Sequence, residues 1–239
     1  MTVVRALNDP QHVVRQYETE TGLAARKAVY QDVTGLDARV LAIGAVLAVA
    51  PDRVLEVGCG EGELAERLTA VVPEVVAVDQ SPRMVELTRA RGVDARVADI
   101  QELPFADDSF DGVLAAWMLY HAADLDRGLS ELARVLRPGG RLVATTNGND
   151  HLAELLALGG LERWDLPFAA ENGVEILGRH FGSVERQDVH GTVTFPDIEL
   201  IRSYFGSSER LSGALDRLPA ALDAPLIARR LPVVFVATL

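Results

Sequence analysis

The chain has 239 residues, of which 49% are hydrophobic and 24% are charged. This is the composition of an ordinary globular protein with a sizeable core, and residues 1–239 suit a single domain. The 35 acidic and 23 basic side chains give a formal net charge of −12. A surface this negative repels phosphate backbones and anionic lipids, so we expect neither nucleic acid nor membrane as a partner.

Cysteine and histidine usage narrows the class of protein further. The single cysteine, Cys59, can form no disulfide within the chain, which favours a reducing, cytoplasmic environment. The five histidines never fall three or four positions apart, so we expect no metal. The first residues lack the apolar core of a signal peptide, and the most apolar run, residues 40–50, is shorter than the ~20 residues of a membrane span.

The first 50 residues are expected to be helical. Apolar positions recur at helical spacing over 11–30, with Gly22 as a break, and again over 36–49, before Pro51. Residues 8–50 therefore predict two helices beside the main domain.

Apolar strands and amphipathic helices alternate over residues 51–147. In the helix after the second strand, Ser81 is expected to cap the first turn, Pro82 to occupy it, and Gly92 to close the helix. Pro138-Gly139-Gly140 is expected to end a later helix. Such continuous apolar strands predict a parallel sheet covered on both faces, a doubly wound α/β fold. We expect its strands at 53–57, 75–78, 93–98, 110–116 and 141–145.

The pattern is looser beyond residue 147. Helices are expected near 152–158 and 171–181, followed by a strand within 184–195. Residues 196–230 have a mixed, helical pattern, and a closing strand covers 233–236. The helical insert at 196–230 is therefore a candidate cap between the last two strands.

The first strand runs directly into a glycine-rich turn with the sequence Glu56-Val57-Gly58-Cys59-Gly60-Glu61-Gly62. Glycines allow a sharp turn and close approach of a ligand, which the N-terminus of the next helix also faces. A dinucleotide fingerprint requires a glycine where this chain has Glu63, so a nicotinamide cofactor is disfavoured. The carboxylate of Glu56 suits a cationic ligand better than a pyrophosphate.

Three further features follow at regular intervals: Asp79 ends the second strand, Asp99 follows the third, and Leu136-Arg137-Pro138-Gly139-Gly140 precedes the fifth. With the glycine turn, they resemble the class I S-adenosylmethionine-dependent methyltransferases, particularly the small-molecule group of ubiquinone and menaquinone biosynthesis. The resemblance covers residues 40–147. It implies a Rossmann-like, mostly parallel seven-stranded sheet with an antiparallel last strand. It also implies S-adenosylmethionine as cofactor, S-adenosylhomocysteine as product and a small-molecule acceptor.

The resemblance assigns roles to several cofactor residues. Asp79 is expected to bind both ribose hydroxyls, and Asp99 with the Ile100 backbone to bind the adenine edge. Met84 either packs on the adenine or belongs to the core. Arg26 either reaches the cofactor carboxylate or lies on a solvated helix face. The remaining cofactor candidates are Glu56, Gly58, Cys59 (as a small turn residue rather than a nucleophile), Gly60, Gln80, Ala115, Ala116 and Tyr17.

Methyl transfer from a sulfonium is an in-line displacement that depends mainly on alignment, and it needs a base only when the acceptor is protonated. His121, after the fourth strand, is the catalytic candidate, either as this base or as a brace of its loop. For each aromatic candidate, two roles remain: packing in the core or contact with the acceptor. The acceptor-binding candidates are Trp117, Tyr120, Trp164, Phe168, Arg202 and Tyr204.

Residues 8–50 and 196–230 are expected to act as lids on the cofactor-binding core at 51–147. The sequence does not determine whether the methyl group goes to an oxygen, a nitrogen or a carbon atom. It also leaves open whether the protein is a monomer or a homodimer. An aminopropyltransferase is an alternative, although the apolar residues 115–118 do not suit a polyamine. A second alternative is a protein that binds S-adenosylmethionine without catalysing a reaction.

Overall fold

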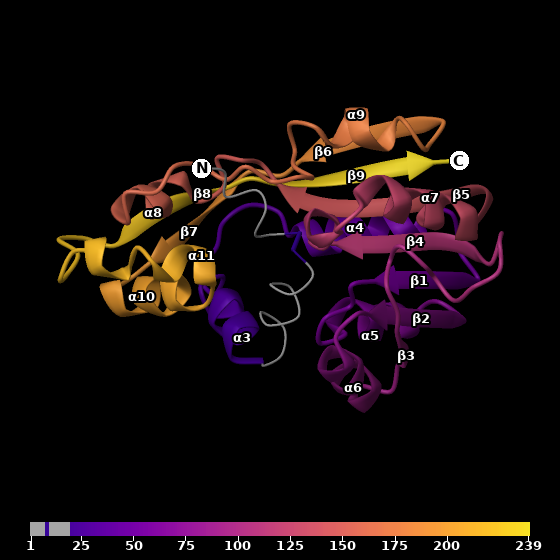
Figure 1. Cartoon of the computed structure of the whole chain (residues 1–239), viewed down its shortest axis with the longest axis horizontal. Coiled ribbons are helices and arrows are strands. Elements are labelled where there is room, and N and C mark those ends of the chain that lie inside the picture. Colours follow the sequence, from indigo (N-terminus) through magenta and orange to yellow (C-terminus); the bar gives the residue numbers. More distant parts are fainter. Residues whose placement is uncertain (1–7, 10–19) are drawn as a thin grey trace.

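The computed structural model describes residues 8–9 and 20–239. Its main element is a seven-stranded sheet with the order β3-β2-β1-β4-β5-β9-β6 (Figure 1). Strands β1 to β5 pair in parallel, whereas β9 is antiparallel to both of its neighbours. The predicted seven-stranded, mostly parallel sheet with an antiparallel last strand is therefore confirmed. The strands are β1 (Arg53–Val57), β2 (Glu74–Asp79), β3 (Asp94–Val97), β4 (Phe110–Ala116), β5 (Leu136–Asn147), β6 (Ser183–Asp188) and β9 (Pro232–Thr238).

Several central strands have consecutive buried apolar residues because alternate side chains enter two different cores. In β2, Val76 and Val78 join the cluster beneath α7 and α9, whereas Val75 and Ala77 join the cluster beneath α4, α5 and α6. Burial of one such side chain contributes roughly 1.5–3 kcal/mol, so both faces need helices to cover them. These helices are α4 (Ala38–Leu47), α5 (Glu63–Thr69), α6 (Pro82–Ala90), α7 (Leu125–Val135), α9 (Gly173–Leu177) and the short 3-10 helix η1 (Leu119–His121).

The local signals at α6 act as expected, but two other boundaries differ. The Ser81 hydroxyl accepts a hydrogen bond from the backbone N–H of Met84, and Pro82 occupies the first turn. The expected end of α7 at Pro138-Gly139-Gly140 is wrong, since β5 begins at Leu136 and a register shift in β4 accommodates these residues. Gly22 is not a break, because it lies within α3 (Glu20–Ala28).

A second, smaller unit projects from the sheet (Figure 1). Strands β7 (Gly191–Phe195) and β8 (Leu226–Arg230) form a separate antiparallel pair, which continues from the antiparallel pair of β6 and β9. Its core contains Phe195, Ile201 and Phe205, and Val29, which directly follows α3, joins it. We call this unit the cap. Its helices are α8 (Ala153–Leu158), α10 (Ile198–Gly206), α11 (Glu209–Ser212) and the 3-10 helix η2 (Leu215–Arg217).

The expected lid segments divide differently in the structure. The insert at 196–230 is helical only in its first part, since residues 226–230 form β8 with alternating burial: Ala228 is buried and Ile227 is exposed. Pairing with β7 overrides the mixed local pattern there. In the N-terminal region, α3 lies between the cap and the sheet, whereas α4 covers a sheet face (Figure 1). None of the described helices is both long and apolar enough to cross a membrane.

Candidate functional site

A cavity of about 690 Å³ lies between the carboxyl edge of the sheet, α3 and the cap. Residues at the ends of β1, β2 and β4 form one side, and α3 and the cap form the other. The volume is in the range of small-molecule and cofactor sites. The carboxyl edge of β1 and its neighbours is also where doubly wound sheets bind their ligands.

The glycine turn after β1 exposes backbone to this cavity. Gly58 and Gly60 have φ angles of 68° and 54°, a left-handed conformation that L side chains rarely adopt. A Cβ atom at Gly58 would lie 2.6 Å from the Cβ atom of Met118, whereas one at Gly60 would meet no atom within 4 Å. Gly58 is therefore required by packing, and the space above Gly60 is open to a ligand.

Asp79 at the end of β2 holds this turn in place. One carboxylate oxygen accepts the N–H of Gly60 at 2.9 Å, and the other accepts the N–H of Ser81 at 2.9 Å. Burial raises the pKa of Asp79, and these two hydrogen bonds oppose the rise. Each oxygen keeps a lone pair, so Asp79 can still accept hydrogen bonds from a ligand hydroxyl.

Glu56 is a buried carboxyl in the wall of the cavity. Its side chain is 2% exposed, and its Oε2 atom has no hydrogen-bond partner among the described residues. Burial raises the pKa of Glu56 to about 8, against the hydrogen bond from the Ala65 N–H, and the nearby charges of Asp79 and Glu63 add to the rise. A group in this state is mostly protonated at pH 7, and a cation beside it would favour its ionised form.

Cys59 lies in the same turn but has the surroundings of a packing residue. The thiol is buried, with Sγ 3.4 Å from Oγ1 of Thr88. Burial raises the pKa of the Cys59 thiol, so the thiolate is strongly disfavoured. This environment fits the prediction that Cys59 is a small turn residue rather than a nucleophile.

The end of β4 brings an aromatic group to the cavity. Trp117 has a φ of 51°, unusual for a bulky residue, and its indole N–H donates to Asn147 Oδ1 at 3.2 Å. Tyr120 and His121 follow on η1, with their ring centroids 4.5 Å apart. All four residues line the cavity. Backbone strain of this kind is characteristic of functional sites.

Most of the residues predicted from sequence line this cavity. Asp99 lies at its rim, exposed, and accepts hydrogen bonds from Gln101. The others that line it are Glu56, Gly58, Cys59, Gly60, Asp79, Gln80, Ile100, Ala116, Arg26, Trp117, Tyr120, His121 and Tyr204.

Five predicted residues lie elsewhere. Met84 and Ala115 are fully buried, which for Met84 favours the core role over the adenine contact. Phe168 lies in the core between the sheet and α9, Trp164 packs in the cap, and Arg202 donates to the carbonyl of Pro219. None of these five lines the cavity. Tyr17 is outside the described residues.

Three residues that the sequence analysis missed also line the cavity. Tyr30 follows α3, His151 precedes α8, and Arg230 ends β8. They are about 80 to 200 positions apart along the chain, and no local motif marks any of them. Arg230 could have been found only if residues 226–230 had been recognised as a strand that pairs with β7.

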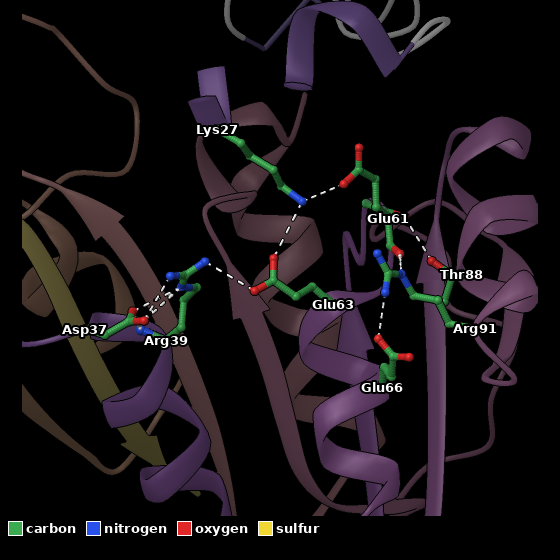
Figure 2. Close-up of polar contacts among 9 residues, drawn as sticks. Lys27, Asp37, Arg39, Glu61, Glu63, Glu66, Thr88 and Arg91 are labelled. Atoms are coloured by element: carbon green, nitrogen blue, oxygen red, sulfur yellow. Dashed lines mark hydrogen bonds and ion pairs between the residues drawn. The ribbon is translucent and has the colours of Figure 1, made fainter. Parts of the chain in front are cut away.

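Ion pairs connect α3 to the glycine turn (Figure 2). Lys27 lies 2.6 Å from Glu61 and 3.6 Å from Glu63, and Arg39 lies 3.2 Å from Glu63. The Lys27 and Arg39 side chains are each 44% exposed, so these pairs contribute little to stability. These pairs neutralise the positive charges of Lys27 and Arg39, and the Lys27 pairs connect α3 to the turn.

The fold and the turn are those of a doubly wound α/β domain, a class of fold in which ligands bind at the carboxyl edge of the sheet. A family profile described as a methyltransferase domain matches residues 55–144. A demethylmenaquinone methyltransferase from Clavibacter sepedonicus is 44% identical over 110 residues, which make up 44% of this chain and 45% of that protein. The chain thus spans about half the length of the curated relatives it matches.

Solved structures resemble nearly the whole chain. The N-methyltransferase NodS from Bradyrhizobium japonicum WM9, solved with S-adenosylhomocysteine, has a TM-score of 0.60 at 18% identity and covers 97% of this chain and 98% of its own. The [4+2]-cyclase SpnF has a TM-score of 0.63 at 19% identity, with 95% of each chain covered. At these identities the likeness concerns the fold. The match of residues 55–144 to a methyltransferase domain is the part of these comparisons that concerns activity, and similar sequences include quinone-biosynthesis methyltransferases.

Proposed function

We propose that this protein transfers a methyl group from S-adenosylmethionine to a small-molecule acceptor. The observation that carries the proposal is the open space above Gly60, bordered by the carboxyl groups of Asp79 and Glu56. The match of residues 55–144 to a methyltransferase domain supports the same conclusion.

The residues around Gly60 fit the parts of this cofactor. Glu56 has a buried oxygen without a partner, which suits the positive charge of the methionine ammonium, either directly or through water. Asp79, Asp99 and Ile100 also line the cavity; Asp79 would accept hydrogen bonds from the ribose hydroxyls, and Asp99 with the Ile100 backbone would accept and donate at the adenine edge. The acidic side of the cavity therefore suits a cationic cofactor better than a pyrophosphate.

The bound cofactor would supply an electrophilic methyl group, and the chain would supply alignment. Trp117, Tyr120 and His121 lie where β4 ends, beside the glycine turn, so they can hold an acceptor in line with the methyl group. The α3 helix and the cap also contribute residues to this cavity, and closed over a bound cofactor they would exclude water. His121 would act either as a general base or as a brace for η1.

Product analysis tests this function directly. The protein is incubated with S-adenosylmethionine and a panel of small metabolites, and S-adenosylhomocysteine is measured by mass spectrometry. We expect acceptor-dependent formation of S-adenosylhomocysteine. Tight cofactor binding without this product from any acceptor would favour a non-catalytic binding protein. In a parallel incubation with decarboxylated S-adenosylmethionine and a polyamine, release of methylthioadenosine would indicate aminopropyl transfer instead.

A further inference from the structure

The cavity has a second end, away from the glycine turn, with a different chemistry. We call it the distal end and define it by Tyr30, His151, Tyr204 and Arg230, all of which line the cavity. The ring of Tyr30 is central to it: its hydroxyl lies 3.0 Å from His151 Nε2, and the Arg230 guanidinium is 5.8 Å from its centroid. All four residues lie outside the 55–144 segment that matches the methyltransferase profile.

The hydrogen bonds of His151 fix which of its nitrogens carries the proton. The backbone N–H of Leu231 donates to Nδ1 at 2.9 Å, so Nδ1 is unprotonated. Burial lowers the pKa of His151 to about 3, and the charge of Arg230 adds to the effect, so the ring is neutral. The proton of a neutral ring then lies on Nε2, which donates to the Tyr30 oxygen.

This arrangement determines the direction of the Tyr30 hydroxyl. Since its oxygen accepts from His151, its own hydrogen is available to a ligand in the cavity. The Tyr204 hydroxyl, which interacts electrostatically with Tyr30, forms no hydrogen bond with a described residue. Burial raises the pKa of Tyr204 to about 12, and the pKa of Tyr30 is raised as well although this residue is 36% exposed, so both hydroxyls remain donors.

Arg230 adds a positive charge that no carboxylate among the described residues neutralises. Its Nη1 donates to the carbonyl of Thr34 at 3.0 Å, its Nε is buried without a partner, and no described carboxylate forms an ion pair with it. By contrast, Lys27 and Arg39 in the same cavity are both paired with acids. A half-buried guanidinium without a counter-ion favours binding of an anion, and its planar fork matches a carboxylate.

We propose that the distal end binds a carboxylate of the methyl acceptor. The guanidinium of Arg230 and the hydroxyls of Tyr30 and Tyr204 all donate, and His151 sets the polarity of Tyr30. This inference rests on the proposed function, and it assigns the acceptor to the class of small carboxylic acids. The family profile does not determine this choice, because the segment that it matches contains none of these four residues.

Calorimetry with matched acids and amides tests the assignment. The probes are benzoate and 4-hydroxybenzoate, each compared with its primary amide, on protein saturated with S-adenosylhomocysteine and on cofactor-free protein. We expect each acid to bind at least tenfold more tightly than its amide, because only the acid forms charge-assisted hydrogen bonds. Arg230→Gln should remove this preference, and Tyr30→Phe should weaken acid binding severalfold.

The neighbouring arginine provides the control. Arg229 is exposed, forms an ion pair with Glu154 and does not line the cavity, so Arg229→Gln should keep the preference for acids. Thermal unfolding checks that each variant is folded. Equal binding of acids and amides, no binding of either acid, or a preference that survives Arg230→Gln would each overturn the proposal. Failure of S-adenosylhomocysteine to bind would instead contradict the proposed function, and the cofactor-free titrations would still test the distal end.

Discussion

Asp79 and Gly60 are joined by a hydrogen bond of 2.9 Å from the Gly60 N–H to the Asp79 carboxylate. The bond connects the end of β2 to the turn after β1, so one side chain both shapes the turn and borders the space above it. A role in cofactor binding and a role in loop geometry are therefore coupled at this position.

Replacement of Asp79 by Ala should weaken S-adenosylhomocysteine binding at least tenfold. The variant loses the acceptor for ligand hydroxyls and the bond to Gly60, and hydrogen bonds to a charged group are worth about 1.5–3 kcal/mol each. Calorimetry measures the affinity, and circular dichroism checks the fold. Asp94→Ala is the control, since Asp94 is an exposed acid at the opposite edge of the sheet. Unchanged affinity in Asp79→Ala would limit Asp79 to a structural role.

Binding of the cationic cofactor should release a proton near pH 7. Burial holds the pKa of Glu56 at about 8 in the free protein, and a nearby ammonium would lower it, so Glu56 would ionise on binding. Calorimetry in buffers with different ionisation enthalpies gives the number of protons released, and Glu56→Gln should abolish that release. The same number of protons in both proteins would show that Glu56 does not face the cofactor's charge.

The same carboxyl should also affect stability in the absence of ligand. The pKa of Glu56 is raised from 4.5 when unfolded to about 8 when folded, so the folded state holds the extra proton between these values. Its contribution is complete below pH 4.5 and is lost as the pH rises to 8, by at most ~1.4 kcal/mol per pH unit. Urea unfolding from pH 5 to 8 should show a steeper decline for the wild type than for Glu56→Gln. Parallel declines would contradict the burial of an unpaired Glu56.

His151 should have the opposite effect at lower pH. Its pKa falls from 6.5 in the unfolded chain to about 3 in the folded protein, so its contribution is complete above pH 6.5 and is lost as the pH falls. His151→Asn keeps an acceptor for the Leu231 N–H without a titrating ring. Urea unfolding at pH 7 and pH 5 should therefore show a smaller loss for this variant. The exposed His190, replaced in the same way, should leave the wild-type loss unchanged.

Ligand binding should order the cover of the cavity. Exposed ion pairs connect the α3 helix to the glycine turn (Figure 2). Helix α10 contributes Tyr204 to the same cavity. Hydrogen exchange of residues 20–30 and 196–217 should slow when S-adenosylhomocysteine is added, as in lids that close on a ligand. The core strand β4 serves as the internal control. Equal exchange with and without ligand in these segments would contradict a closing cover.

The cofactor end of the site could be predicted because its signals are local. Gly58 and Gly60 lie in one turn, and Asp79 ends the next strand, so the parallel topology alone brings them to one edge. The distal end could not be predicted, because Tyr30, His151 and Arg230 meet only after β8 pairs with β7. Residues 226–230 were predicted to be helical, and tertiary pairing reversed that local preference.

Experiment can distinguish the two roles considered for His121, a general base and a brace of η1. It lies on η1 after β4 and lines the cavity, and its ring contacts that of Tyr120. If it is a general base, His121→Ala should lower kcat by about a hundredfold or more while cofactor affinity is kept, since such bases contribute about 10²–10⁴. The loss should shrink as the pH rises, because the acceptor then ionises without help.

If His121 is a brace, the same variant should show a different pattern. Loss of the Tyr120 contact would loosen η1, so thermal stability, cofactor affinity and acceptor affinity should fall together, with no dependence of the loss on pH. His121→Gln separates the two roles further, because glutamine can replace a structural hydrogen bond but cannot take up a proton at neutral pH. Rescue of kcat by Gln would therefore favour the brace, and full loss with normal stability would favour the base. A His121→Ala variant with wild-type rate and stability would contradict both roles.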